Sequence, residues 1–174
     1  VTSLPGPAAC ITALTMSGLA TRRFCFEAFL PREKKERAEI VKELEKETRT
    51  IIVYEAPHHL IRTLEELYAV LGDRRIRLCR ELTKKHEEVF PTTFAEALSF
   101  YQENEPRGEY VIVIEGKSRA ELKIEQQKEW EAMTLQEHMA YYEDQGTDRK
   151  EAMKLVAKDR GISKRDVYQA LLER

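Results

Sequence analysis

Two groups of ionisable side chains follow directly after apolar stretches of the chain. Glu55 and His58 come after the β-branched run that begins at Thr50, and Glu81 and Lys84 come after a shorter alternating stretch. A carboxylate or a neutral amine beside a weak nucleophile, such as a hydroxyl group, can accept its proton. Lysine does this only where burial or nearby cations lower its pKa. For Glu55 and His58 the alternative is the start of a helix with a solvated His58, and for Glu81 and Lys84 it is an ordinary salt-bridged loop.

A Pro-Gly turn near the N-terminus is a third candidate, of a different kind. Pro5 and Gly6 precede an apolar segment that starts at Ala8 and Ala9 and is predicted to be helical. The first N–H groups of a helix have no partner within the helix, and they can hold a carboxylate or a phosphate. Such turns often do no more than redirect the chain, so the turn alone does not establish a binding site.

Strands and helices alternate along the chain as far as Gly116, which predicts an α/β domain. β-branched and alternating apolar runs predict the strands, and apolar residues at helical spacing predict the helices. Open α/β sheets bind ligands at the carboxyl ends of their strands, where Glu55 and Glu81 stand. These patterns leave the order of the strands open. The predicted strands cover residues 24–29, 50–55, 76–80, 89–90 and 110–114, and the predicted helices cover residues 8–17, 33–47, 60–71 and 94–103.

The composition becomes more polar after Gly116, and the predicted domain boundary lies there. Residues 1–118 are predicted to be the α/β domain, and residues 119–133 a linker helix rich in Glu, Lys and Gln. Residues 134–174 are predicted to be a small domain that consists of helices only.

The small domain resembles a helix-turn-helix unit in its length and turns. Thr134 and Glu137 form a capping-box pattern at its start, and Gly161 separates its last two helices. Ser163 and Asp166 cap the final helix in the same way. That helix is expected to turn four apolar residues inward, namely Val167, Tyr168, Leu171 and Leu172.

The net charge of the chain is only −2, because 29 basic residues nearly balance 31 acidic ones. No global field therefore attracts a polyanion. Residues 147–174 differ, with eight basic and five acidic residues, a local excess of three positive charges. Lys164 and Arg165 open the last predicted helix, where they would face the phosphate backbone of a nucleic acid. A small helical domain also needs a charged exterior to stay soluble, so the charge has a second explanation.

The cysteines and the apolar runs argue against several other classes of protein. Cys10, Cys25 and Cys79 lie far apart and lack the spacing of metal or redox sites. Reduced thiols in a cytoplasmic protein without a metal are the expectation. The longest apolar runs are far shorter than the about 20 residues that a bilayer requires, so no membrane association is expected.

Five segments, in their order and spacing, together resemble one protein family. They are Leu4 to Ala9, Arg23 to Pro31, Tyr54 to His58, Arg80 to Lys84 and Gly108 to Gly116. The chain resembles the ribosomal RNA small-subunit methyltransferase I family, which belongs to the tetrapyrrole-methylase superfamily. The resemblance covers essentially the whole chain. The third and fourth segments distinguish this family from the porphyrin-precursor methylases.

The resemblance implies a two-domain α/β enzyme that binds S-adenosylmethionine in the cleft between its domains. The reaction that it implies is methyl transfer to the ribose 2′-hydroxyl of a cytidine in 16S ribosomal RNA, with the RNA itself or the small ribosomal subunit as the partner. This chain would hold the C-terminal domain of the tetrapyrrole-methylase fold, a mixed sheet flanked by helices, and the helical domain. The family's N-terminal domain would precede Val1, so the chain is expected to carry half of the cofactor site and to be inactive alone. A homodimer is also expected.

The resemblance also implies which residues of this chain act. Leu82 is expected to contact the adenine through its main chain. Relatives commonly have Arg where this chain has His59, so the resemblance gives weak support for phosphate binding at this position. They commonly have Ser or Cys where this chain has Ala8, so only backbone groups are expected to bind there. The expected cofactor-binding residues are Pro5, Gly6, Ala8, Ala9, Tyr54, Glu55, Leu82 and Thr83, and the catalytic candidates are Glu55, Lys84 and Glu81.

Two other classes of function remain open. A methylase of a tetrapyrrole or another small molecule would need an enclosed apolar pocket and would have no use for a helical tail. A non-catalytic nucleic-acid-binding module would use the tail and would not bind the cofactor. Cofactor binding by the intact protein distinguishes an enzyme from a binding module.

Overall fold

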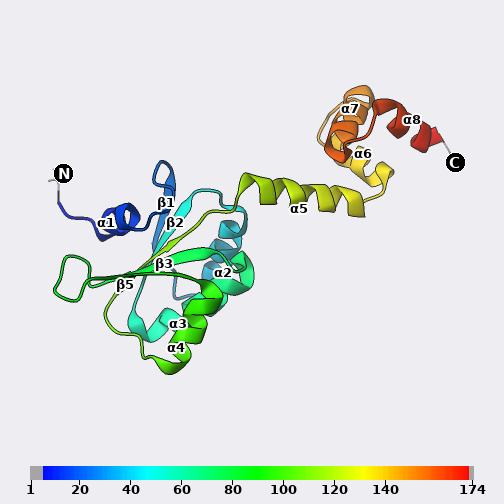
Figure 1. The fold of residues 1–174 in the computed structure, drawn as a ribbon. Helices are drawn as coiled ribbons and strands as arrows, with labels where there is room; N and C mark the ends of the chain where they lie inside the picture. Colours follow the sequence, from blue (N-terminus) through cyan, green and yellow to red (C-terminus); the bar gives the residue numbers. More distant parts are fainter. Residues whose placement is uncertain (1–5, 173–174) are drawn as a thin grey trace, which may run out of the picture. The chain divides into compact units, whose positions relative to one another are not determined.

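A mixed five-stranded sheet forms the centre of the first part of the chain in the computed structural model, which describes residues 6–172 (Figure 1). β1 and β2 are parallel, whereas β5 runs antiparallel to β2 and β3, and β4 runs antiparallel to β3. The predicted α/β fold with a mixed sheet is confirmed. The strands follow the order β1 (Phe24–Phe29), β2 (Thr50–Glu55), β5 (Tyr110–Ile114), β3 (Arg75–Arg80) and β4 (Glu88–Thr93).

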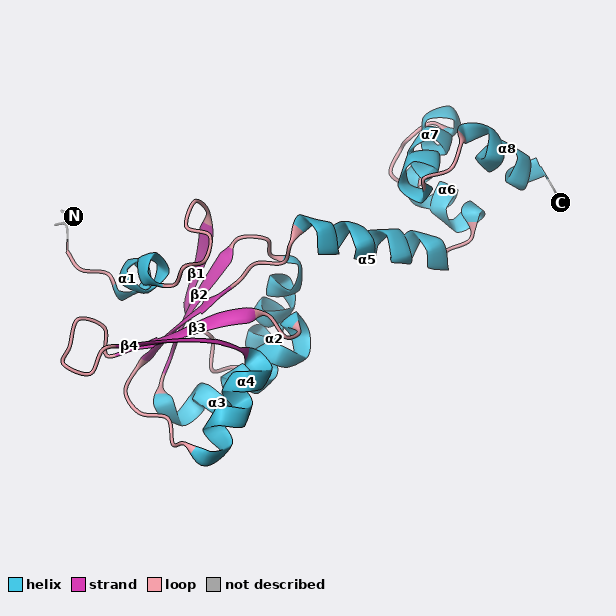
Figure 2. Cartoon of the chain, viewed as in Figure 1, coloured by secondary structure: helices cyan, strands magenta, loops and turns pink. Residues whose placement is uncertain are grey.

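Helices cover both faces of the sheet (Figure 2). One face, which we call the α1 face, is covered by α1 (Ala9–Met16). The opposite face, which we call the α3 face, carries the larger hydrophobic core. It is covered by α2 (Lys34–Glu43), the short 3-10 helix η1 (Leu44–Lys46), α3 (Pro57–Leu71) and α4 (Phe94–Glu103).

The two central strands, β2 and β5, are buried on both faces. Successive side chains of a strand point to opposite faces, so Val53 packs with Leu64 on the α3 face while Ile52 packs with Leu14 on the α1 face. Every residue of β5 is buried, and so are all residues of β2 except Tyr54. Burial on both faces explains why these strands are continuous apolar runs in the sequence.

Both edge strands carry an irregularity. Pro91 in β4 lies opposite Arg77 of β3, and proline is tolerated there because an edge strand need not donate outward. In β1, a bulge at Ala28 gives that residue a left-handed φ of 51°. The prediction of a strand at residues 89–90 was too short, because the proline did not stop the pairing, which continues to Thr93.

The chain divides into two compact units after Ser118, and the second unit consists of helices in its described part. The predicted capping box of Thr134 and Glu137 is confirmed at the start of α6, and Gly161 ends α7 with a left-handed φ of 64°. Met139, Ala152, Val156 and Val167 are the buried centre of this helical unit. The helices are α5 (Arg119–Ala132), α6 (Leu135–Glu143), α7 (Arg149–Arg160) and α8 (Lys164–Leu172).

One stripe of α8 packs inward. Val167 is buried and Leu171 is half-buried against the neighbouring helices, whereas Tyr168 and Leu172 are 54% and 61% exposed. The prediction that all four face inward is wrong for Tyr168 and Leu172. Neighbouring residues differ by about 100° around a helix, and α8 packs against α6 and α7 through one stripe only.

A buried histidine ties α5 to the rest of the helical unit. Trp130 of α5 stacks on the fully buried His138, with ring centroids 4.1 Å apart and an angle of 9°. His138 Nδ1 accepts a hydrogen bond of 3.1 Å from Arg160 Nε, and its Nε2 lies 3.4 Å from Asp159 Oδ2. Because the guanidinium can only donate, these contacts fit a neutral imidazole that carries its proton on Nε2. Burial, followed by the nearby Arg160, lowers the pKa of His138.

The helical unit is therefore expected to lose stability as the pH falls below about 6.5, the ordinary pKa of histidine. In that range the unfolded chain binds a proton that the folded unit binds only at lower pH, so acid favours unfolding. Trp130 is the chain's single tryptophan, so its fluorescence reports unfolding of this unit. We expect its urea midpoint to be lower at pH 5 than at pH 7.

Two variants make this measurement specific. His138→Phe keeps a flat ring against Trp130 without a titrating group, so the midpoint should depend less on pH. His86→Gln alters an exposed histidine and should keep the pH dependence of the parent chain. Equal midpoints for the parent at both pH values would show that His138 does not stay neutral in the folded unit.

Candidate functional site

The position of β5 between β2 and β3 brings the ends of these two strands to one edge of the sheet. Tyr110, the first residue of β5, pairs with Glu55, the last residue of β2. On its other side Tyr110 pairs with Arg80, the last residue of β3. Residues 54–58 and 80–84, far apart in sequence, therefore meet at the kind of edge where open α/β sheets bind ligands.

An open groove of about 290 Å³ lies at this edge on the α1 face, and we call it the α1 groove. Ala9 contributes to it from the start of α1, and Phe29 from the end of β1. The groove brings together five of the residues that the sequence singles out: Ala9, Tyr54, Glu81, Leu82 and Lys84.

Tyr54 holds the start of α1 in place. Its hydroxyl oxygen accepts a hydrogen bond of 2.9 Å from the backbone N–H of Cys10, one of the first amides of the helix. The rings of Phe26 and Phe29 meet the Tyr54 ring edge-on, with centroids 5.0 and 5.6 Å away. Burial raises the pKa of Tyr54, so the hydroxyl stays neutral. The N-cap residue Ala8 has no side chain that could take over this bond.

The loop after β3 holds its charged residues in a strained backbone. Glu81 and Thr83 have left-handed φ values of 49° and 65°, which residues other than glycine rarely adopt. Lys84 Nζ lies 3.2 Å from Glu81 Oε1, and the Thr83 N–H donates a hydrogen bond of 2.6 Å to Glu87 Oε2. A Cβ on Gly108 would lie 2.9 Å from Glu81 Oε1, so the glycine leaves room for this carboxylate. Such strain is typical of functional loops.

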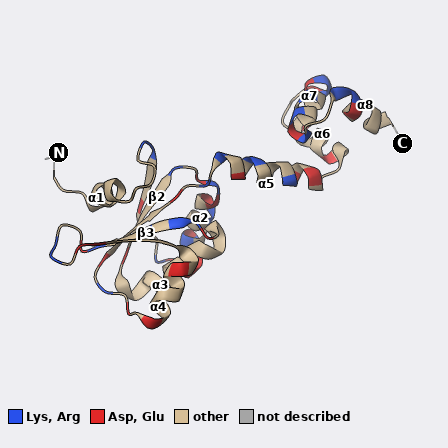
Figure 3. Ribbon diagram, in the orientation of Figure 1, with Lys and Arg blue, Asp and Glu red and all other residues tan. Residues whose placement is uncertain are grey.

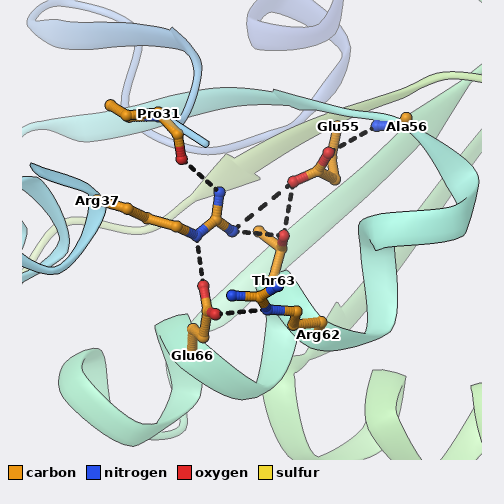
Figure 4. Close-up of polar contacts among 7 residues, drawn as sticks. All are labelled: Pro31, Arg37, Glu55, Ala56, Arg62, Thr63 and Glu66. Carbon is orange, nitrogen blue, oxygen red and sulfur yellow. Dashed lines mark hydrogen bonds and ion pairs between the residues drawn. The ribbon is translucent and has the colours of Figure 1, made fainter. Parts of the chain in front are cut away.

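Glu55 lies on the other face of the sheet, in a polar cluster at the end of β2 (Figure 4). Its carboxylate accepts hydrogen bonds of 2.6 Å from Thr63 Oγ1 and 2.8 Å from the Ala56 N–H. Arg37 Nη2 lies 3.9 Å from the same carboxylate and donates to Thr63 Oγ1 at 2.7 Å. Arg37 is fixed in turn by Glu66 Oε2, 2.5 Å from its Nε.

The structure therefore does not bring Glu55 together with Glu81 and Lys84. The side chain of Glu55 is only 6% exposed, and Glu55 lines a separate pocket of about 320 Å³ on the α3 face. His58 and His59 line that pocket as well, at the start of α3.

The remaining predicted site residues are dispersed. Pro5 lies outside the described residues, and Gly6 and Ala8 are exposed before α1. Thr83 is exposed in the strained loop. Lys164 and Arg165 lie at the start of α8 in the helical unit, the first half-buried and the second exposed.

Sequence reasoning gave no role to several residues that complete these sites. Phe29, Glu109 and Tyr110 line the α1 groove, and Arg37 supports Glu55. A signal for Arg37 was present, because it falls on the apolar face of its predicted helix, where an arginine needs a buried partner.

Among residues 6–172 no group of three or more His, Cys, Asp or Glu side chains is placed to hold a metal ion. Over the same range, none of the helices has both the length and the apolar character needed to cross a membrane. Burial raises the pKa of Cys79, which lines the α1 groove, to about 11, so the thiol stays protonated and is a poor nucleophile.

Comparison with known proteins identifies relatives of the chain. Residues 1–98 match the model of the family described as Tetrapyrrole (Corrin/Porphyrin) Methylases. The chain is 44% identical over 170 residues to the Ribosomal RNA small subunit methyltransferase I of Bacillus subtilis (strain 168), covering 98% of this chain and 58% of the relative. It is 37% identical over 174 residues to the protein of that name from Synechocystis sp., covering 99% of this chain and 61% of the relative. The chain thus spans about three fifths of the length of these relatives.

Two solved structures share the fold of the α/β unit. The methyltransferase CobJ superposes with a TM-score of 0.52 at 16% identity, over 64% of this chain and 49% of CobJ. The cobalt precorrin-4 methyltransferase CbiF gives 0.50 at 15% identity, over 64% of this chain and 50% of CbiF. At these identities the two structures establish the fold alone. The family match and the relatives confirm the resemblance seen in the sequence, and the chain belongs to the tetrapyrrole methylase family, in which it is similar to the ribosomal RNA small subunit methyltransferases I.

Proposed function

We propose that this chain is part of an S-adenosylmethionine-dependent methyltransferase that modifies 16S ribosomal RNA, and that the methyl acceptor is the ribose 2′-hydroxyl of a cytidine. The names of the relatives support a ribosomal RNA substrate. The α1 groove is the observation that carries the proposal, because it gathers the start of α1 and the ends of β2 and β3. We also propose, from the resemblance to this methyltransferase family, that the enzyme is cytoplasmic.

The residues of the α1 groove fit part of S-adenosylmethionine. Ala9, Phe29 and Val111 give it apolar walls, and Glu81 and Glu109 supply carboxylates that suit the positive charges of the cofactor. Its volume of about 290 Å³ is at the lower end of the roughly 300–1,000 Å³ of small-molecule sites. Because the chain spans about three fifths of its relatives, we propose that residues outside these 174 complete the site and that the chain alone is inactive.

Methyl transfer to a hydroxyl group releases a proton, which a nearby base must accept. Bound S-adenosylmethionine would supply the electrophilic methyl group. Two residues of the α1 groove are candidates for this proton transfer, Glu81 and Lys84. The Glu81 carboxylate would accept the proton, and Lys84, whose Nζ lies 3.2 Å from Glu81 Oε1, would position that carboxylate. Glu55, which hydrogen-bonds within the α3 face, is proposed instead as a positioning residue for the end of β2.

Lys84→Ala in the full-length enzyme is expected to lower the rate of methyl transfer at least tenfold, which corresponds to about 1.4 kcal/mol. The affinity for S-adenosylmethionine, measured by calorimetry, should change by less than about threefold on the same free-energy scale. Lys85→Ala removes a neighbouring exposed lysine and is the matched control. A rate within about twofold of the parent would remove Lys84 from the proposed chemistry.

Glu55→Gln is expected to lower the free energy of unfolding of the α/β unit by about 1–3 kcal/mol. The carboxylate is buried, and the Ala56 N–H, the Thr63 hydroxyl and the Arg37 guanidinium all present donors to it, so the amide group of glutamine leaves one donor facing another. The urea midpoint followed by circular dichroism measures the change, with the exposed Glu65→Gln on α3 as control. Unchanged stability together with a large loss of methyl transfer would make Glu55 a catalytic residue.

We also propose that the helical unit contacts the phosphate backbone of the RNA. The start of α8 carries Lys164 and Arg165. Figure 3 shows basic residues along α7 and at the start of α8. Residues 147–174 have three more basic than acidic residues, opposite in sign to the whole chain. Backbone contact of this kind gives affinity without base recognition.

The double variant Lys164→Ala and Arg165→Ala in the full-length enzyme is expected to weaken binding to 16S ribosomal RNA. The dependence of the binding constant on salt concentration should also decrease, by the equivalent of up to about two phosphate contacts. The loss should raise KM rather than lower kcat. Lys35→Ala on α2, whose side chain is 85% exposed, controls for the loss of a surface charge. Unaltered affinity across a salt titration would assign the charges to solubility alone.

A homodimer, implied by the resemblance, has one supporting observation. Phe24, Phe26 and Phe29 of the edge strand β1 are 36%, 43% and 57% exposed, and Ile11 and Met16 on α1 are exposed as well. Exposed apolar side chains in such number are typical of a surface that another protein segment covers.

A further inference from the structure

A third cavity, rich in aromatic side chains, opens at the same edge of the sheet as the α1 groove but on the α3 face, where Tyr101 and Tyr110 belong to the core. Its volume is about 490 Å³, and it lies beside the end of α4, so we call it the α4 cavity. Phe90 of β4 and Phe100 of α4 form its apolar wall, with ring centroids 5.1 Å apart. Phe100 is 44% exposed, although its ring meets both Phe90 and Tyr101. A large ring is thus held in place while part of it stays open to solvent.

Hydrogen-bonding groups surround this apolar wall. The Tyr101 hydroxyl donates to the Tyr110 hydroxyl at 3.2 Å, and the Arg107 N–H donates to the same oxygen at 3.2 Å. Arg80 Nε donates to Glu88 Oε2 at 2.5 Å. Three carboxylates and two guanidinium groups line the cavity, so its charge does not favour a phosphate. They are Glu88, Glu103, Glu105, Arg80 and Arg107. A flat ring with polar edges matches this lining better.

The α4 cavity shares a wall with the α1 groove. Arg80 and Tyr110 line both, the first at the end of β3 and the second at the start of β5. The two sites lie on opposite faces of the sheet and meet at this edge, so a polymer that presents one unit to the α1 groove has to pass around the edge to place a neighbouring unit in the α4 cavity.

We propose that the α4 cavity binds the base of an unpaired nucleotide in the RNA substrate, stacked on Phe100 and next to the nucleotide that is methylated. The inference rests on the proposed function. Proteins recognise single-stranded RNA by stacking splayed bases on aromatic rings and by hydrogen bonds to the base edges. Carboxylates are suited to accept a hydrogen bond from the exocyclic amine of cytosine, and Glu88 stands at the wall of the cavity.

The test measures binding of a fluorescent, cytidine-rich, single-stranded oligoribonucleotide of about ten nucleotides to the full-length enzyme by anisotropy. Phe100→Ala should weaken binding by roughly 5- to 150-fold, the range that loss of one base stack corresponds to. Phe100→Trp should restore affinity to within about threefold of the parent, because stacking needs only a flat ring. Tyr68→Ala on α3 removes an aromatic side chain of similar exposure, 39%, away from the cavity and should leave binding unchanged.

Two results would overturn the proposal: no binding of the oligoribonucleotide by the parent enzyme, or equal affinity for Phe100→Ala and the parent. If RNA affinity is equal and the association state of Phe100→Ala changes, the cavity would be the contact site of a protein partner. Methyl transfer, measured separately, distinguishes this inference from the proposed function. If the enzyme binds RNA through Phe100 but methylates no ribosomal RNA, only the proposed function is refuted. If it methylates ribosomal RNA normally but Phe100→Ala and the parent bind RNA equally well, only the present inference is refuted.

Discussion

The hydrogen bonds that β5 makes on both sides are the constraint on which the site depends. Tyr110 pairs with Glu55 on one side and with Arg80 on the other, so the ends of β2 and β3 stand level at the edge. Adjacent strands lie about 4.8 Å apart, which separates these two ends by about 10 Å. Tyr54 and the loop that starts at Glu81 both line the α1 groove, together with Tyr110 and Val111 of the strand between them. A shift of β5 by one residue would exchange the faces of all its side chains, so each would meet the core on the wrong side of the sheet.

Because successive side chains of a strand point to opposite faces of the sheet, the adjacent residues Tyr54 and Glu55 have different roles. Tyr54 points to the α1 face, where its hydroxyl holds the first turn of α1. Glu55 points to the α3 face, where Thr63 and Arg37 connect its carboxylate to α3 and α2. One strand end therefore orients helices on both sides of the sheet. A side chain whose place in a sequence motif predicts a catalytic role can therefore have a structural role instead. The motif does not indicate which face of the sheet the side chain points to.

Local patterns predicted most elements, because their causes are local. The apolar runs of β2 and β5 and the capping box at Thr134 needed no knowledge of the rest of the chain. The strand order was beyond reach, because pairing depends on contacts between distant segments. So were the surroundings of Glu55, since its partner Arg37 comes from another element. The exposure of Tyr168 shows the same limit, because helical spacing indicates a face without giving the width of the contact.

The irregular edge strands determine how the sheet can associate with other chains. Free edge strands invite pairing with other strands, which leads to aggregation. Pro91 removes one donor from β4, and the bulge at Ala28 distorts β1. Both edges are therefore poor templates for a sixth strand. Any assembly of this unit has to use side-chain surfaces, such as the phenylalanines of β1, and not a continuous intermolecular sheet.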